Sequence, residues 1–203
     1  MELKLLDLDG LRRAYRALMP CSFPPEERKP QREMEEVARS GRYLALGALD
    51  AGGIVGMATA FRVEPGWALF DYLCVAPERR NGGLGARLVR ELTGRMGRCV
   101  LFGESESPAY AGDPALAARR LDFYRRCGAR EAGYEMALFG VVFRVLYWAD
   151  RDVPAGEILR RHEAAWRDRF TPEDYARFAS IPWTPADGVL ARIDWSKVKE
   201  EDL

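Results

Sequence analysis

The chain has 203 residues, of which 48% are hydrophobic and 31% are charged, and its 31 basic side chains balance 31 acidic ones. This length and composition suit a globular protein that buries its own core, and the balanced charge argues against nucleic acid as a principal partner. Charged residues among the first fifteen positions argue against a secretory signal, and no apolar run approaches the ~20 residues that span a bilayer. We therefore expect a cytoplasmic protein without membrane association.

The N-terminal part of the chain predicts a strand followed by two helices. Residues 3–8 can form the strand, and Asp9 can cap a helix whose apolar residues recur at helical spacing. Prolines between residues 20 and 30 should break any helix there, because proline removes a backbone donor. A second amphipathic helix is expected over residues 33–39, so a proline-rich loop should join the two helices.

The middle of the chain predicts an antiparallel meander followed by a helix. Three β-type runs, at residues 43–49, 54–63 and 67–75, are separated by turn residues. Apolar residues at helical spacing then predict a helix that ends at Gly97, and another strand is expected at residues 99–102. Because a helix connects the strands on either side of it, these two strands should pair in parallel.

The remaining sequence completes a mixed α/β protein. A helix is expected over residues 115–126, and two apolar runs flank Gly140. After Asp150 the composition changes to a charged helix at residues 154–169 and a second helix that begins after Thr171. We therefore predict a mixed, mostly antiparallel sheet flanked by helices in residues 1–149, and a helical C-terminal extension in residues 150–203.

The most informative segment lies at the turn between the third β-type run and the following helix. A helix N-terminus exposes unpaired N–H groups and the positive end of its dipole, which favours a bound pyrophosphate. Gly82, Gly83 and Gly85 permit positive φ and leave room for a ligand near the backbone, while Arg79 and Arg80 can supply countercharge. The turn is therefore a candidate anion site.

Two common phosphate motifs do not fit this turn. A Walker loop needs Lys and then Ser or Thr after its last glycine, but Ala86 and Arg87 follow Gly85. A Rossmann turn needs a third small residue, where this chain has Leu88. The pattern Arg80-x-x-Gly83-x-Gly85 instead resembles the acyl-CoA signature of the GNAT superfamily of acetyltransferases, and the resemblance spans roughly residues 3–150.

The resemblance implies a GNAT-type fold and acetyl-CoA as acyl donor. It places the pyrophosphate on the turn and a backbone N–H that supports the oxyanion on the preceding strand. The implied cofactor-binding residues are Leu73, Cys74, Val75, Arg80, Asn81, Gly82, Gly83, Leu84, Gly85 and Ala86.

A second segment, at residues 118–129, resembles the family's helix that ends in a Tyr-x-x-x-Gly pattern. The resemblance implies that Tyr124 protonates the departing thiolate. Chemistry supports this role independently, because a phenol with a pKa of about 10 stays protonated at neutral pH and can donate to a thiolate. Packing in the core is the alternative role for Tyr124. Many relatives carry Asn where this chain has Ala117, which puts cofactor contacts from this helix in doubt.

Candidate residues for the base and the acceptor site are acidic. The family often uses a Glu near the end of the next strand as base, which maps to Glu104, with Glu106 and Asp71 as further candidates. Glu26 and Glu27, in the proline-rich loop, could join Glu106 and Asp71 in holding a cationic acceptor. Each of these carboxylates could equally well solvate a loop or balance an arginine.

Other chemistries lack their components. The four cysteines show no CxxC spacing and favour reduced thiols, and the only histidine, His162, lies in a charged segment where we expect it on the surface. Neither a His-based triad nor a multi-histidine metal site can be assembled, so we expect no metal.

We therefore predict an N-acetyltransferase that moves an acetyl group from acetyl-CoA to a primary amine, in the first instance of a small molecule. Two alternatives stay open: an acyl-CoA-binding sensor or scaffold without turnover, and an acetyltransferase of protein N-termini or lysines. The extension is rich in aromatic residues, which can cover the core, the acceptor channel or a second subunit, so a homodimer is also possible.

Overall fold

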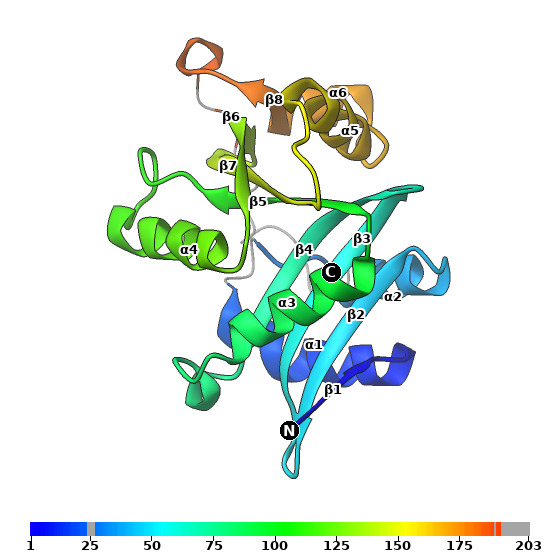
Figure 1. Cartoon of the computed structure of the whole chain (residues 1–203). Helices are drawn as coiled ribbons and strands as arrows, with labels where there is room; N and C mark the ends of the chain where they lie inside the picture. The colour runs from blue at the N-terminus through cyan, green and yellow to red at the C-terminus, as the bar shows by residue number, and fades with distance from the viewer. Residues whose placement is uncertain (24–26, 189, 192–203) are drawn as a thin grey trace. The chain divides into compact units, whose positions relative to one another are not determined.

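The computed structural model of the chain describes residues 1–23, 27–188, 190 and 191. They form two compact units: the first comprises Met1–Gly97, and the second begins at Arg98 (Figure 1). Within each unit the strands pair antiparallel, and helices pack against them. Within the described residues, no helix is both long and apolar enough to cross a membrane.

The first unit is built on the antiparallel sheet β1-β2-β3-β4. Tight turns join its long strands, and Gly53 and Gly66 take positive φ values of 120° and 80° there, which a residue with a Cβ rarely adopts. The elements of this unit are β1 (Glu2–Leu5), α1 (Leu8–Ser22), α2 (Gln31–Arg39), β2 (Tyr43–Asp50), β3 (Gly53–Glu64), β4 (Trp67–Val75), the 3-10 turn η2 (Pro77–Arg79) and α3 (Leu84–Met96).

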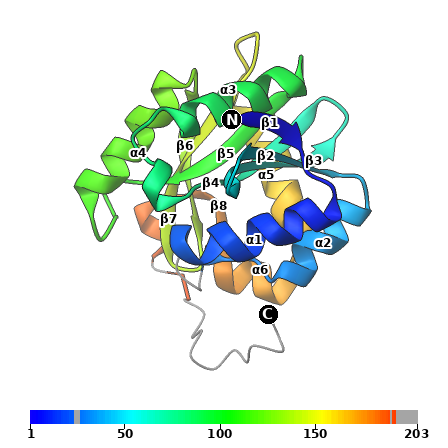
Figure 2. The same ribbon diagram turned by 90° about the horizontal axis from the view of Figure 1, so that it is seen from below.

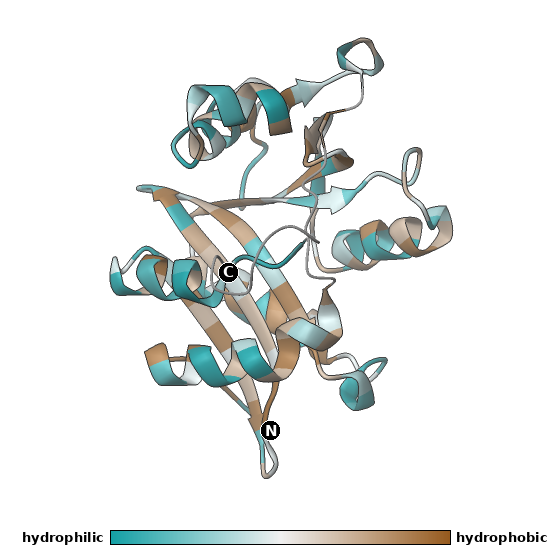
Figure 3. Cartoon of the chain, turned by 180° about the vertical axis from the view of Figure 1, so that it is seen from behind, coloured by the Kyte–Doolittle hydropathy of each residue, from teal (hydrophilic) through white to brown (hydrophobic). Residues whose placement is uncertain are grey.

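Helices cover both faces of the first sheet. Figure 2 shows α3 on one side of these strands and α1 with α2 on the other. The packing is close, since a Cβ at Gly56 would lie 2.9 Å from the Leu88 side chain. Apolar residues follow the strands of this sheet in Figure 3, as expected for a sheet buried on both faces.

The second unit has the antiparallel strand order β5-β7-β6-β8. Ala117 and Leu121 are buried on α4, which packs against β5, whereas α5 contacts β6 and β8. Its elements are β5 (Val100–Glu106), α4 (Pro114–Arg126), β6 (Arg130–Leu138), β7 (Val141–Trp148), α5 (Ala155–Arg167), α6 (Pro172–Phe178), β8 (Ala179–Trp183) and the 3-10 turn η3 (Pro185–Asp187).

The mixed, mostly antiparallel α/β architecture predicted from the sequence is confirmed, with three local corrections. Asp7 caps α1 in place of Asp9, since its side chain accepts from the N–H of Gly10 at 2.7 Å. Pro20 lies inside α1, whose last turn continues to Ser22. The C-terminal extension also contributes a strand, β8, which pairs with β6 in the second unit. The parallel pairing of β4 with β5 stays a prediction. The division of the chain into a core (residues 1–149) and an extension (residues 150–203) also stays a prediction.

Candidate acetyl-CoA site and catalytic residues

The predicted pyrophosphate turn connects β4 to α3 in the first unit. After the η2 turn the backbone takes positive φ at Asn81 (63°) and Gly83 (78°), and α3 then begins at Leu84. Two left-handed residues so close together reverse the chain into the helix. Asn tolerates this conformation better than most residues with a Cβ, and glycine adopts it freely. The turn's shape therefore follows from its residue types.

The start of α3 has no side-chain cap. Asp7 caps α1 and Asp113 caps α4, but Gly83, at the N-cap position of α3, has no side chain that could accept from the first-turn N–H groups. The first N–H groups of a helix have no partner within the helix. Those of Leu84, Gly85 and Ala86 can thus bind an anionic ligand.

The two arginines of the turn have partners within the first unit. Arg80 donates from Nε to the carbonyl of Val75 at 3.0 Å and from Nη2 to the carbonyl of Cys21 at 2.8 Å. Arg79 forms an ion pair with Asp50. Arg80 therefore holds the turn against the end of β4 and the end of α1 and keeps its positive charge, so its predicted role as countercharge stays a prediction.

A basic cavity of about 630 Å³ adjoins the turn. Its positive charge is carried partly by Arg87 and Arg90, which are exposed on α3 and have no ion-pair partner among the described residues. The cavity is lined by Met1, Glu78, Arg79, Arg80, Gly82, Gly83, Leu84, Arg87 and Arg90. Four arginines line it, and of these Arg79 is paired with Asp50 while Glu78 is the one carboxylate in the lining, so the excess of positive charge suits a polyanion.

The strand residues that precede the turn lie on β4. Leu73, Cys74 and Val75 are in register with Ala58, Met57 and Gly56 of β3. Burial raises the pKa of the Cys74 thiol to about 12, so this thiol stays protonated and unreactive at neutral pH. Any contribution of this strand to the cofactor would come from its backbone.

The predicted acceptor residues of the first unit lie at the loop between α1 and α2 and on β4. Asp71 forms an ion pair with Lys29 and accepts a hydrogen bond from Tyr43 at 2.6 Å. The hydroxyl of Tyr72 donates to the carbonyl of Glu27 at 2.9 Å. Asp71 thus anchors the loop through Lys29, and Glu26 lies outside the described residues. An acceptor contact by Asp71 or Glu27 stays a prediction.

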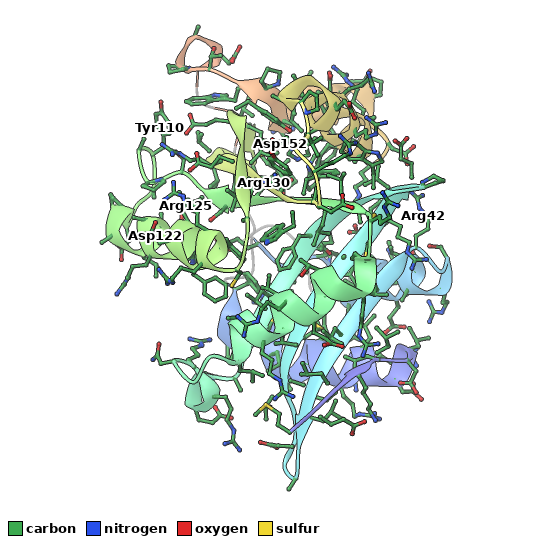
Figure 4. The ribbon with its side chains drawn as sticks, in the orientation of Figure 1. Arg42, Tyr110, Asp122, Arg125, Arg130 and Asp152 are labelled. Carbon is green, nitrogen blue, oxygen red and sulfur yellow. The ribbon has the colours of Figure 1, made fainter. Side chains whose placement is uncertain are left out.

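Tyr124 lies in the last turn of α4, where its ring is half-buried. It packs edge-on against Phe123 and Trp148, with ring centroids 5.2 and 5.8 Å away. Asp122 and Arg125 form an ion pair at 2.7 Å on the exposed side of the same helix (Figure 4). The ring of Tyr124 therefore packs against β7 through Trp148.

Glu104 is held by a buried polar network in the second unit. Its Oε1 lies 2.7 Å from Nε2 of His162 and accepts from Nε1 of Trp166 at 2.9 Å. Nδ1 of His162 lies 3.0 Å from the hydroxyl of Tyr134. The expectation that His162 lies on the surface was wrong, since its side chain is 0% exposed.

The network of Tyr134, His162 and Trp166 was missed because its members come from separate parts of the sequence. His162 and Trp166 are four residues apart on α5, so they share one helix face, and this spacing was the only local signal. Glu106, the second acidic candidate on β5, lies 3.9 Å from Arg120. Within the described ranges, His, Cys, Asp and Glu side chains form no group of three or more that could hold a metal.

Comparison with known proteins identifies the family. Residues 11–129 match the model of the acetyltransferase (GNAT) family, which is more than half of the chain. No curated protein matches the chain closely enough to count as a relative.

Solved structures share the fold at low sequence identity. A protein from Bacteroides thetaiotaomicron assigned to the GNAT family has a TM-score of 0.65 at 20% identity, and the match covers 83% of this chain and 98% of that one. A spermidine N-acetyltransferase from Vibrio cholerae has a TM-score of 0.55 at 13% identity, covering 73% and 95%.

An aminoglycoside 6'-N-acetyltransferase complexed with coenzyme A has a TM-score of 0.58 at 16% identity, covering 76% of this chain and 99% of that one. Identities this low establish a shared fold, and the family match covers both the glycine turn and Tyr124. The chain therefore belongs to the GNAT family of acetyltransferases.

Proposed function

We propose that the protein transfers an acetyl group from acetyl-CoA to the primary amine of a small molecule. The observation that carries the donor assignment is the uncapped start of α3 at Gly83, beside a cavity rich in arginine. The pyrophosphate of CoA binds the backbone N–H groups between Arg80 and Ala86. Arg80, Arg87 and Arg90 supply positive charge, whereas Arg79 is paired with Asp50.

The reaction is direct attack of the amine on the thioester. The acceptor nitrogen forms a bond to the acetyl carbon, and the bond from that carbon to sulfur breaks. Glu104 removes one proton from the acceptor ammonium so that the nitrogen can attack, and Tyr124 donates its phenolic proton to the leaving thiolate. The nitrogen loses its second proton to solvent as the amide forms, and solvent returns a proton to Tyr124. A backbone N–H from Leu73–Val75 supports the oxyanion.

The class of acceptor is proposed on two grounds. Structures with the same fold include enzymes named for spermidine and for aminoglycosides, both of which are small amines. The candidate acceptor residues of this chain, Glu27, Asp71 and Glu106, are carboxylates, which suit a cationic acceptor.

The donor assignment is tested with two glycine substitutions of equal backbone strain. Gly83→Ala places a Cβ on the turn at a φ of 78°, and Gly66→Ala places one in the β3–β4 turn at a φ of 80°; neither Cβ meets another atom within 4 Å. Both variants should lose similar stability, about 1 kcal/mol. Calorimetric titration with acetyl-CoA should then show at least tenfold weaker binding for Gly83→Ala and unchanged binding for Gly66→Ala. Equal affinity in both variants would remove the turn from the donor site.

Turnover is tested by release of CoA from acetyl-CoA with a panel of small amines and peptides. A thiol reagent that reports CoA also reacts with the exposed Cys21, so the assay uses a Cys21→Ser background. Faster release with small amines than with peptides supports the proposal. Release with peptides alone would favour a protein acetyltransferase, and binding of acetyl-CoA with no release would favour a sensor.

A further inference from the structure

His162 occupies the centre of a three-residue chain of polar contacts. Its imidazole lies between the hydroxyl of Tyr134, 3.0 Å from Nδ1, and the carboxylate of Glu104, 2.7 Å from Nε2. The ring of Phe102 packs on the imidazole at 5.2 Å, and none of the His162 side chain is exposed. A buried polar side chain costs free energy unless its hydrogen bonds are made, so the two contacts fix the ring.

The two partners of the imidazole together indicate which of its nitrogens carries hydrogen. Burial and then the negative charge of Glu104 raise the pKa of Tyr134 well above its ordinary value, so its phenol keeps its proton and can either donate to Nδ1 or accept from it. An ionised carboxylate can only accept, so the 2.7 Å contact with Glu104 places a hydrogen on Nε2. A neutral imidazole with its hydrogen on Nε2 then accepts from Tyr134 through Nδ1.

Glu104 receives a second donor from the same helix. Nε1 of Trp166 donates to the same Oε1 at 2.9 Å and also lies 3.3 Å from Nε2 of His162, so with hydrogen on Nε2 this carboxylate oxygen accepts two hydrogen bonds. Two donors on one carboxylate oxygen favour its ionised form and hold its orientation. The Glu104 side chain keeps 16% of its surface exposed, so a substrate proton can still reach it.

Other titratable groups lie on the elements around this network. The guanidinium of Arg169 lies 5.4 Å from the ring of Trp166. On α6, burial and then Glu163 raise the pKa of the Tyr175 hydroxyl, and β8 carries no titratable side chain. His162 and Trp166 are the two α5 side chains that contact the Glu104 carboxylate directly.

We propose that His162, oriented by Tyr134, is a positioning residue that donates from Nε2 to Glu104 and keeps this carboxylate ionised as the base for the acceptor amine. The inference rests on the proposed role of Glu104. It goes beyond that role because it assigns the control of the base to α5, outside the residues 11–129 that match the family.

The hydrogen position is tested on the free protein by NMR. Because the chain has one histidine, all imidazole ¹⁵N signals come from His162 and need no further assignment. At pH 7.5 we expect Nε2 to carry hydrogen and Nδ1 to have the shift of an unprotonated nitrogen, and Tyr134→Phe should mix the two tautomers. Hydrogen on Nδ1 alone, or on both nitrogens, would overturn the proposal whatever the activity.

The effect on the base is tested by the pH profile of kcat/KM for a small amine. His162→Leu removes the donor, so the acidic limb should move up by about one pH unit or more. His162→Gln places an amide donor near the same carboxylate and should restore most of the shift. Ile158→Val, one turn earlier on α5 and equally buried, should leave the limb in place. If the acidic limb of kcat/KM lies at the same pH in His162→Leu, His162→Gln and the wild-type protein, the proposal is contradicted.

Glu104→Gln separates this inference from the proposed function. If Glu104→Gln keeps full turnover, Glu104 is not the base and the proposed mechanism fails. If Glu104→Gln loses turnover while His162→Leu leaves the pH profile unchanged, only the role of His162 fails. Circular dichroism across the same pH range checks that each variant is folded, and Tyr134→Phe provides the readout if His162→Leu does not fold.

Discussion

Trp148 donates a hydrogen bond from its indole Nε1 to the carbonyl of Cys127 at 3.1 Å, just past the end of α4. The same indole packs against the ring of Tyr124. One side chain of β7 thus fixes both the end of the helix and the tyrosine that the helix carries. The acid proposed for the leaving thiolate therefore depends on a residue that does not take part in the chemistry.

Trp148→Phe should lower both stability and rate. Phenylalanine keeps an aromatic ring beside Tyr124 but leaves the buried carbonyl of Cys127 without its donor, which costs about 1 to 3 kcal/mol. We expect kcat to fall several-fold while the affinity for acetyl-CoA is unchanged. Urea unfolding and steady-state kinetics measure the two effects. A loss of stability with an unchanged kcat would show that Trp148 does not position Tyr124.

Tyr124→Phe removes the proposed general acid but keeps the ring contacts with Phe123 and Trp148. Loss of general acid catalysis should lower kcat about 100-fold or more. Binding of acetyl-CoA, measured by calorimetry, should stay within twofold of wild type. Unchanged turnover would exclude Tyr124 from the mechanism and leave it a packing residue.

Glu35 should make the protein less stable in acid. It is nearly buried between α1 and α2, and hydrogen bonds from Arg12 and then Gln31 hold its pKa at about 2, below its ordinary 4.5. A lowered folded-state pKa contributes stability that is full above about 4.5 and is lost as the pH falls towards 2. Glu35→Gln should therefore reduce the loss of stability between pH 5 and about 3. Urea unfolding at both pH values tests this, and parallel curves for wild type and variant would contradict it.

Asp71 should restrain the loop between α1 and α2. Asp71→Asn removes the ion pair with Lys29 and weakens the hydrogen bond from the half-buried Tyr43. Trypsin should then cleave after Arg28 several times faster than in wild type. Asp9→Asn is a matched control, because Asp9 forms an ion pair with Arg12 but its side chain is 73% exposed. Similar cleavage rates in both variants would show that Asp71 does not anchor the loop.

Local sequence signals predicted most elements, because strands, turns and helix ends depend on neighbouring residues. The run at residues 67–75 matches β4 residue for residue, and Gly97 ends α3 as expected. The prediction failed where a local rule had two candidates: Asp7 and Asp9 can both cap α1, and only the course of the chain before the helix selects Asp7.

Contacts between distant segments could not be predicted in this way. β8 is a strand because it pairs with β6, some forty residues earlier in the chain, and nothing in its five residues requires that partner. His162 lies in a helix with many charged residues, which suggested exposure, yet one face of that helix is buried with Ile158, Ala165 and Trp166. The candidate donor site could be predicted because the residues of its turn are contiguous in the sequence. The contacts of Glu104 could not be predicted because its partners lie far away in the sequence.

The helix α5 lies wholly beyond residue 129, where the match to the family ends, and its His162 and Trp166 both contact Oε1 of Glu104. In the proposed mechanism, the residues that bind the acetyl donor and the residues that set the strength of the base therefore lie in different stretches of the sequence. We expect that substitutions in the extension shift the pH dependence of turnover and preserve the binding of acetyl-CoA. Transfer of this extension to a related acetyltransferase would carry that pH dependence with it.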